Sequence, residues 1–301
     1  MADRIAAIDC GTNSIKLLIG EAPQVLVRES RMVRLGQGVD TTGRLSEEAL
    51  ARTFAAIDEF AALIAAYDVT RVRFCATSAT RDAGNASAFT DGVRARLGVT
   101  PEVLSGDEEA ALVFAGAVGH LPGPVDGPVL VVDIGGGSTE LVLGTESPDS
   151  AVSMDIGSVR LHERHLHADP PTPGQVAVCV SDIDAHLDTC PVPLADARSV
   201  IGTSGTIKTL AAAMLALPVY DRDAIDGAEL GTAETAAYVD RLVAMTVAER
   251  REIPSMHPGR ADVIGAGALI WSRVLDRSGV SSYRVSEADI LYGIATSLVE
   301  P

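Results

Sequence analysis

Lysine is almost absent from this 301-residue chain, which contains only Lys16 and Lys208. Arginine supplies nearly all the positive charge, and acidic residues outnumber basic ones so far that the formal net charge is −17. Proteins that hold nucleic acid through its phosphates usually present a basic face, so this balance argues against a nucleic-acid partner. Any anionic ligand must be bound locally, by backbone amides and a few arginines, whose guanidinium groups bind phosphate at two points.

Aromatic residues, cysteine pairs and long apolar runs are scarce as well. Aromatic residues make up 4% of the chain and hydrophobic residues 47%, which predicts an aliphatic core. No apolar run approaches the ~18 residues of a membrane-spanning helix, so we expect no membrane partner. The four cysteines include no CxxC pair, and the N-terminus lacks the pattern of a secretory signal peptide. We therefore expect reduced thiols and a cytoplasmic protein.

One pattern, an apolar strand, a glycine turn and a second apolar strand, occurs twice. The segments "IAAIDCGTNSIKLLIG" at 5–20 and "VVDIGGGSTELVLG" at 131–144 align when Asp9 is placed on Asp133. Helices and strands alternate after each segment, and a chain of this length usually exceeds a single core. The repeat therefore predicts two α/β domains of similar topology with a cleft between them. The alternative is that the second hairpin is merely a tight turn.

The predicted elements place the domain boundary in "PGPVDGP" at 122–128, where residues that end helices and form turns accumulate. We expect an N-terminal domain at 1–122, joined by a C-terminal helix at 287–301, and a second domain at 123–286. A long amphipathic helix with Ser46 as its N-cap follows the first strands. The expected strands are 4–9, 14–22, 24–36, 71–79, 101–105, three within 129–156, 198–202 and 283–287, and the expected helices include 46–68, 106–121 and 288–300.

The polar residues of the repeat lie in its turns, a placement that suits anion binding. Glycine lets the backbone approach a ligand closely and adopt positive φ without strain, and clustered backbone N–H groups bind phosphate oxygens. Two such turns could hold a chain of phosphates from both sides, so each half of the molecule would contribute one turn. The candidate phosphate-binding residues are Gly11, Thr12, Asn13 and Ser14 in the first turn and Gly135, Gly136, Gly137, Ser138 and Thr139 in the second.

An aspartate stands before each turn, where its carboxylate would repel phosphate unless a cation lay between them. Magnesium bound through one or two carboxylates, waters and phosphate oxygens supplies such a cation. We predict Asp133 as the metal ligand, with Asp9 as the second choice. Manganese is an alternative metal because it also prefers oxygen ligands. The other explanation is that each aspartate only stabilises its turn by accepting backbone hydrogen bonds.

The duplicated hairpins resemble the phosphate-binding turns of the actin, sugar-kinase and heat-shock chaperone superfamily. Within it, the chain is similar to the Ppx/GppA family of exopolyphosphatases and guanosine pentaphosphate phosphohydrolases, through the ordered strings "AIDCGTNS", "RLGQGV", "ATSATRD", "SGDEEAAL", "VVDIGGGSTEL", "DIGSVRL", "GTSGT" and "PGRADVIGAG". The resemblance extends from the first strand to the final helix. It implies two ribonuclease-H-like (actin-like ATPase) domains, in the short form that lacks an additional HD-type domain. It also implies hydrolysis of terminal phosphate from inorganic polyphosphate or, alternatively, from guanosine pentaphosphate.

The same resemblance assigns catalytic roles to two glutamates. It places the general base, which takes a proton from water, in "SGDEEA", and favours Glu109 over Glu108. Acidic residues in the first turn of a helix also stabilise its dipole, so a structural role is the alternative. Glu140 is expected to hold the water or the metal, and Lys16 stands at the equivalent position of the first hairpin. Outward exposure is the alternative for both side chains.

Three cationic side chains are candidates for further phosphate contacts. Arg81 follows the strand "RVRFCATSA" and is expected to clamp a phosphate. Its spacing from Cys75 matches a cysteine-phosphatase loop, but no glycine lies between the two, and a buried structural thiol fits better. Lys208 in "GTSGTIKT" lies one turn into a helix, where it either binds phosphate or is solvated. Arg260 either lines the same path or forms a salt bridge.

Other interpretations stay open from the sequence alone. A sugar kinase or ATPase would share the turns, and a non-catalytic sensor could bind an alarmone nucleotide through them. The histidines of "HERHLH", His162, His165 and His167, do not share one helix face, so we interpret them as surface residues rather than metal ligands. A two-fold homodimer is expected only because such dimers are common.

Overall fold

The computed structural model of the protein describes residues 4–299 apart from 22–23, 122, 124 and 126. The chain forms two compact units, Met1–Gly116 with Ile290–Pro301, and Ala117–Asp289. The C-terminal segment therefore belongs to the first unit. The predicted domain boundary at residue 122 lies outside the described residues.

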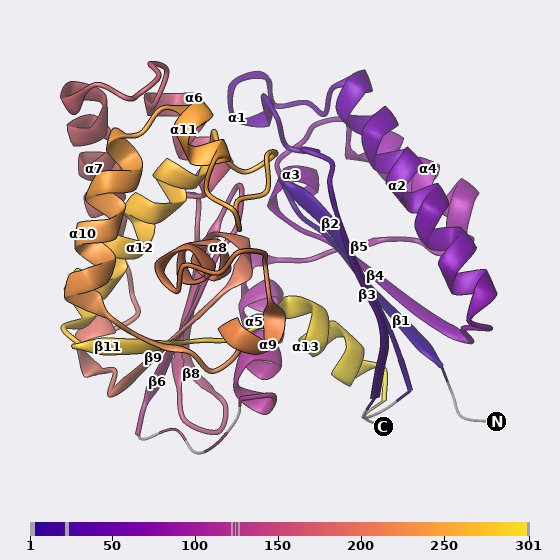
Figure 1. The fold of residues 1–301 in the computed structure, drawn as a ribbon. Helices are drawn as coiled ribbons and strands as arrows, with labels where there is room; N and C mark the ends of the chain where they lie inside the picture. Colours follow the sequence, from indigo (N-terminus) through magenta and orange to yellow (C-terminus); the bar gives the residue numbers. More distant parts are fainter. Residues whose placement is uncertain (1–3, 22–23, 122, 124, 126, 300–301) are drawn as a thin grey trace. The chain divides into compact units, whose positions relative to one another are not determined.

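The first unit is built on a five-stranded sheet. Its strands are β1 (Ile5–Cys10), β2 (Ser14–Glu21), β3 (Gln24–Met32), β4 (Arg71–Ala76) and β5 (Glu102–Val103). They lie in the order β3-β2-β1-β4-β5 (Figure 1). β1 and β2 pair antiparallel and form the first glycine hairpin, whereas β4 runs parallel to β1 on its other side. β1 is buried along its whole length, as expected of a strand covered on both faces.

Helices cover both faces of this sheet. They are α1 (Val39–Thr42), α2 (Glu47–Ala66), α3 (Ser78–Arg81), α4 (Ala86–Leu97), α5 (Gly106–Gly119), which ends in the second unit, and α13 (Ile290–Ser297). α2 and α4 lie on one face of the sheet and α13 on the other (Figure 1). The N-cap prediction for α2 is confirmed, because the Ser46 side chain accepts a hydrogen bond from the N–H of Ala49.

The second unit has a six-stranded sheet in which the second glycine hairpin is central. Its strands are β6 (Val129–Ile134), β7 (Thr139–Gly144), β8 (Pro148–Met154), β9 (Ser199–Thr203), β10 (Glu229–Gly231) and β11 (Ser282–Val285). Its helices are α6 (Ser158–His165), α7 (Pro173–Asp188), α8 (Ser204–Met214), α9 (Arg222–Ile225), α10 (Thr232–Ala244), α11 (Val247–Arg251) and α12 (Ile264–Ser278). Across the described residues, no helix has the length and apolarity that crossing a membrane requires.

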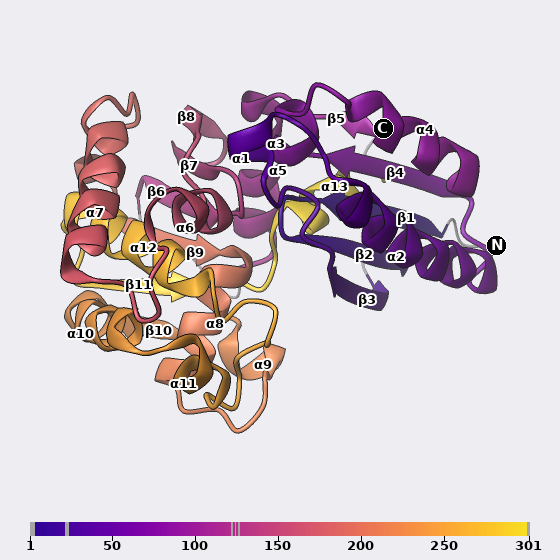
Figure 2. The ribbon, with the colours of Figure 1, turned by 90° about the horizontal axis from the view of Figure 1, so that it is seen from above.

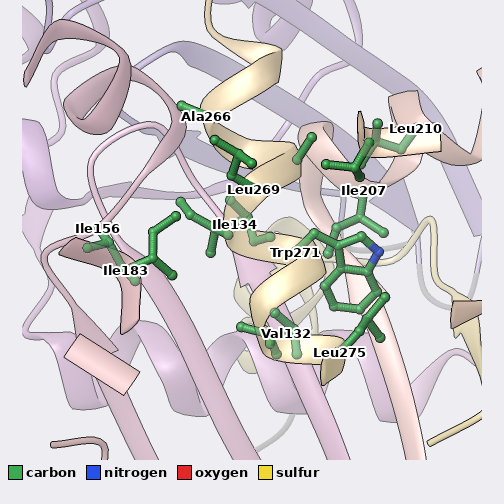
Figure 3. Packing of buried hydrophobic residues seen from close by; sticks show 14 of the residues in the cluster. Val132, Ile134, Ile156, Ile183, Ile207, Leu210, Ala266, Leu269, Trp271 and Leu275 are labelled. Atoms are coloured by element: carbon green, nitrogen blue, oxygen red, sulfur yellow. The ribbon is translucent and has the colours of Figure 1, made fainter. Parts of the chain in front are cut away.

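The core of the second unit forms around α12 and is mostly aliphatic. Figure 3 shows Trp271 and Leu275 of α12 among Val132 of β6 and Ile207 of α8. The Trp271 ring meets the ring of Tyr283 edge to face, with centroids 4.8 Å apart. The hairpin strand β6 therefore shares the core of this unit with α12, and both elements are labelled in Figure 2.

The two sheets repeat one topology. The order β8-β7-β6-β9-β11 in the second sheet corresponds to β3-β2-β1-β4-β5 in the first, with the hairpin strands antiparallel and the crossover strands parallel in both. The prediction of two α/β units of similar topology is confirmed. β10 has no counterpart in the first sheet. It is absent from the predicted strands because its three residues carry too little pattern.

The strand predicted at 71–79 is wrong in its last part. β4 ends at Ala76, and α3 begins at Ser78. The C=O of Thr77 accepts hydrogen bonds from the N–H groups of Thr80 and Arg81, at 3.0 and 3.1 Å, so the chain turns helical there. Arg81 consequently stands at the end of a short helix rather than directly after a strand.

Candidate active site

The two glycine turns close in the same way. In the first, the N–H of Gly11 donates a hydrogen bond to the C=O of Ser14 at 3.0 Å. In the second, the N–H of Gly135 donates to the C=O of Ser138 at 2.9 Å. In each turn, two residues lie between the residue that donates this hydrogen bond and the residue that accepts it. The same backbone atoms form the bond at aligned positions of the two sequence segments.

The carbonyl groups of the first turn are held by the segment that follows β3. The C=O of Asn13 accepts hydrogen bonds from the N–H groups of Val33 and Arg34, at 3.1 and 2.9 Å. The C=O of Thr12 accepts one from the N–H of Gly36 at 2.9 Å. In a trans peptide the N–H points opposite to the C=O, so the N–H of Asn13 faces away from this segment. That N–H has no hydrogen-bond partner among the described residues.

The carbonyl groups of the second turn are held by the start of α6. The C=O of Gly136 accepts hydrogen bonds from the N–H groups of Val159 and Arg160, at 2.8 and 3.1 Å. The Arg160 side chain donates through Nε to the C=O of Gly137 at 2.7 Å. In the part of the chain that the structure describes, the N–H groups of Gly136 and Gly137 have no partner. Both turns therefore present N–H donors on the side opposite their anchored carbonyls, an arrangement that binds anions.

Two further glycines allow these anchoring segments to approach the turns. A Cβ on Gly157 would lie 2.5 Å from the carbonyl carbon and oxygen of Gly136, so only glycine fits there without moving the turn. A Cβ on Gly36 would overlap the side chain of Thr12. The strings "RLGQGV" and "DIGSVRL", which carry part of the family resemblance, thus supply the segments that fix the two turns.

The side chains opposite the two aspartates differ between the hairpins. Strand register places Asp9 opposite Lys16, and the Lys16 Nζ lies 3.1 Å from the Asp9 Oδ2. It places Asp133 opposite Glu140, and both are buried, with 6% and 1% of their surface exposed. Glu140 accepts a hydrogen bond through Oε1 from the Ser153 hydroxyl at 2.7 Å. Outward exposure of Glu140 is therefore wrong, and Lys16 has an ion-pair partner.

This difference bears on where a metal could bind. Directly opposed side chains on antiparallel strands have Cβ atoms about 4.5–5.5 Å apart, so Asp133 and Glu140 bring two carboxylates close together. Such a pair favours a cation between its members, whereas Lys16 already neutralises Asp9. No group of three or more His, Cys, Asp or Glu among the described residues could hold a metal ion. A cation at the second hairpin would complete its shell with water and substrate oxygens, as Mg²⁺ commonly does.

The adjacent glutamates at the start of α5 have different environments. Glu108 accepts hydrogen bonds from the N–H and hydroxyl of Ser105, at 2.9 and 2.8 Å, which is the pattern of a capping box. These bonds hold the pKa of the exposed Glu108 below its ordinary value. Glu109 is only 6% exposed and accepts a hydrogen bond from Arg81 Nη1 at 3.1 Å. Glu108 is thus a helix cap, and Glu109 is the candidate base.

Arg81 and Cys75 do not form a cysteine-phosphatase loop. The Arg81 guanidinium bonds the C=O of Leu104 at 2.9 Å as well as Glu109, so the turn from β4 to α3 directs it toward α5. Cys75 is fully buried in β4, opposite Asp9. Burial raises the pKa of its thiol to about 12, so no thiolate is available near neutral pH. The buried structural thiol is the interpretation that fits.

Lys208 lies at the predicted place, in the first turns of α8, but it is not solvated. Its side chain is buried, with Nζ 3.0 Å from the Asp289 carboxylate and 3.2 Å from the C=O of Glu287. Its assignment to phosphate binding stays a prediction, because Asp289 already matches its charge. The Arg260 guanidinium lies against Gly205, where an added Cβ would overlap it. Among the described residues Arg260 forms no salt bridge, so that alternative is wrong.

Ser204, the first residue of α8, ties this helix to the second turn. Its backbone has a φ of 72°, a left-handed conformation that is rare outside glycine. Its hydroxyl accepts a hydrogen bond from the N–H of Ile134 at 3.1 Å and donates one to the C=O of the same residue at 2.8 Å. Ile134 immediately precedes the glycines, so the serine side chain extends the pairing of β6 beyond the end of β9.

Some contributors carry no recognisable chemical signal in the sequence. Ser153 is a hydroxyl on an edge strand, and its role depends on the register between β7 and β8. Arg160 reads as one more surface arginine, yet it bonds a carbonyl of the second turn. The surface interpretation of the histidines is wrong for His165, which is half-buried and bonds Asp182 at 2.7 Å.

The chain is similar to known proteins in both sequence and structure. The model of the Ppx/GppA phosphatase family matches residues 15–299. The chain is 45% identical to Exopolyphosphatase 2 of Mycobacterium tuberculosis, over 98% of each chain. It is similar to the crystal structure of an exopolyphosphatase-like protein, at 44% identity, a TM-score of 0.95 and 98% coverage of each chain. It is also similar to the Ppx/GppA family member of Aquifex aeolicus, at 30% identity, a TM-score of 0.80 and coverage of 99% and 97%.

Proposed function

The chain belongs to the Ppx/GppA phosphatase family, and we propose that it is an exopolyphosphatase, which hydrolyses the terminal phosphate of inorganic polyphosphate with water. Support comes from relatives that bear the name exopolyphosphatase and match the chain over nearly its full length. The four cysteines are free thiols, which accords with a reducing, cytoplasmic environment as part of this proposal.

The observation that carries the proposal is the shared construction of the two turns. Each has its carbonyls anchored by the protein and its N–H groups directed the other way, which leaves donors for a polyanion. Donors fixed in this way cost no reorganisation when charge develops on phosphate oxygens. Each turn would bind phosphate oxygens of the substrate through these N–H groups.

The buried carboxylates have two proposed roles, proton transfer and metal binding. Glu109 is the proposed base, which takes the proton of the attacking water, and Arg81 orients its carboxylate through the bond to Oε2. Asp133 and Glu140 fit a hard cation, because two buried carboxylates stand opposite each other in the register of β6 and β7. Bound Mg²⁺, or Mn²⁺ in its place, would neutralise phosphate charge at that position.

Matched substitutions at the start of α5 test the function. Purified protein with Mg²⁺ and long-chain polyphosphate should release phosphate. Glu109→Gln should lower kcat by about 10²–10⁴-fold, the usual contribution of a general base. The control is Glu108→Gln on the adjacent capping residue, which should keep the rate. A Glu109→Gln variant with full activity would remove this mechanism.

Guanosine pentaphosphate is the competing substrate with the same reaction. The names of the relatives favour polyphosphate. Specificity constants for both substrates, measured on one preparation, decide between them. ATP turnover or phosphate transfer to a sugar, with polyphosphate inert, would instead indicate a kinase or ATPase. Tight nucleotide binding without phosphate release would indicate a sensor.

A further inference from the structure

Asn13, in the first turn, carries a buried side-chain amide that the protein does not satisfy. The residue is 7% exposed, and neither its Oδ1 nor its Nδ2 has a hydrogen-bond partner among the described residues. Its backbone is firmly held, because its C=O accepts hydrogen bonds from Val33 and Arg34. The equivalent position in the second turn is Gly137, so only the first turn presents a side chain at this point.

An unsatisfied amide is unusual in a folded protein. Burial removes it from water, and the lost hydrogen bonds are a free-energy cost that few native side chains bear without a functional reason. Thr12, its neighbour in the same turn, shows the contrast, because its hydroxyl pairs with the hydroxyl of Ser78 at 3.0 Å. The surroundings of the turn therefore supply a hydrogen-bond partner to the Thr12 side chain but none to the amide of Asn13.

The two ends of the amide require different partners. Nδ2 is a donor and needs an acceptor, whereas Oδ1 is an acceptor and needs a donor. The oxygens of a phosphoanhydride chain are acceptors and can satisfy only Nδ2. Because both atoms lack partners, this holds for either orientation of the amide group. The reaction proposed above has one further participant that can donate, the attacking water.

We propose that Asn13 is a catalytic residue that binds both reactants, with Nδ2 on an oxygen of the terminal phosphate and Oδ1 accepting one O–H of the attacking water. This rests on the proposed function. Glu109 accepts the other proton of that water as its oxygen forms the new bond to phosphorus. The bridging P–O bond breaks, and its electron pair leaves with the shortened polyphosphate. Asn13 thereby sets the angle between water and phosphorus, on which in-line displacement depends.

Two substitutions at this position separate the two contacts. Asn13→Leu keeps the shape and removes both polar atoms, whereas Asn13→Asp keeps an acceptor for water but turns a second acceptor toward the phosphate. We expect Asn13→Leu to lower kcat by about 10²–10³-fold, as for loss of a fixed polar group in other active sites. Asn13→Asp should mainly raise KM, by about tenfold or more, and should retain a higher kcat than Asn13→Leu. Equal kcat values in the two variants would overturn the role of Oδ1.

Thermal unfolding without substrate supplies a second, independent readout. Because Asn13→Leu removes an amide that has no internal bond, the variant should melt no lower than the wild type. Inorganic phosphate should raise the melting temperature of the wild type and have a smaller effect on Asn13→Leu. A clearly lower melting temperature of the ligand-free variant would show an internal role for the amide and overturn the inference. If the wild type releases no phosphate, the proposed function fails and the inference with it. If both the wild type and Asn13→Leu turn over normally, only the inference fails.

Discussion

The two glycine hairpins have the same strand pairing and the same turn closure, but they differ in the charged residues of one cross-strand pair. Both turns are closed by one N–H to C=O bond, and both have carbonyls held by a segment from elsewhere in their unit. Behind the turn, however, the first hairpin pairs Asp9 with Lys16 and the second pairs Asp133 with Glu140. The first pair joins a carboxylate to an ammonium group, whereas the second joins two carboxylates.

If the proposed assignments hold, the two copies of the hairpin share anion binding and differ in metal binding. Anion binding depends on backbone N–H groups, so it survives any change of the residues behind the turn. Metal binding depends on side-chain oxygens, so a single exchange between lysine and glutamate decides whether a hairpin suits a cation. In the first unit the proposed base comes from another element, as Glu109 of α5.

The largest effect is expected when the second hairpin is given the pair of the first. Glu140→Lys would place an ammonium group opposite Asp133 and exclude a divalent cation. Polyphosphatase activity should fall by about 10²–10³-fold, and added Mg²⁺ should no longer raise the melting temperature. Glu140→Gln, a smaller change, should show the same loss of Mg²⁺ response in thermal melts. An unchanged response in both variants would place the metal elsewhere.

Smaller losses of stability and activity are expected when either anchoring glycine is replaced, and the losses should differ between the two positions. Gly157→Ala forces a Cβ onto the backbone of Gly136, whereas in Gly36→Ala the overlap is with the side chain of Thr12. Backbone cannot move aside as a side chain can, so Gly157→Ala should cost about 1–3 kcal/mol of stability and Gly36→Ala less. Displacement of the turn should also lower activity, by up to about 10²-fold for Gly157→Ala.

Urea denaturation and polyphosphate hydrolysis measure the two consequences. Gly174, at the start of α7, is the matched control, because an added Cβ meets nothing within 4 Å. Gly174→Ala should be neutral or slightly stabilising, since alanine is the better helix former. Equal effects at Gly157 and Gly36 would mean that the two turns tolerate displacement alike.

A more modest effect is expected from the residue that orients Glu140. Ser153→Ala removes the hydrogen bond to Oε1 and should reduce activity by about tenfold, with a higher Mg²⁺ concentration required for half-maximal rate. Ser153→Thr keeps a hydroxyl, so its half-maximal rate should require the same Mg²⁺ concentration as the wild type. Ser150→Ala on the same strand is the control. A fall in rate at unchanged Mg²⁺ dependence would contradict a role in positioning the metal ligand.

The smallest effect should come from Cys75, which lies behind the first turn. Because burial raises the pKa of its thiol to about 12, the group stays protonated near neutral pH. Cys75→Ser should keep most of the activity, and iodoacetamide at pH 8 should not inactivate the folded protein. Rapid inactivation that Cys75→Ser abolishes would revive thiol chemistry at this site.

Local sequence was sufficient to predict the hairpins, the capped helix α2 and the repeated topology. These features depend on apolar alternation, turn residues and an N-cap, all of which act over a few residues. The end of β4 was not predictable in this way, because "ATSATR" suits a strand or a helix and the contacts of Thr77 decide. β10 exists only because β11 offers it an edge for pairing.

The candidate site was predictable in its turns but not in its partners. Glycines and hydroxyl-bearing residues predict an anion-binding turn. The resemblance to the Ppx/GppA family predicts Glu109 as the base. That Glu108 caps α5 while Glu109 meets Arg81 depends on the rotation of the helix about its axis. The contacts of Gly36, Arg160 and Ser153 depend on tertiary packing and strand register, which no short string encodes.

The serine at the start of α8 has a consequence for how this part of the molecule can vary. One hydroxyl serves both backbone groups of Ile134 from a residue whose φ is 72°. Glycine would relax the backbone but sever the link, and threonine would keep the link on a β-branched residue that strongly disfavours this angle. The Ser204 hydroxyl therefore adds a hydrogen-bonded connection between α8 and the residue before the second turn, so a substitution at this position would affect both elements.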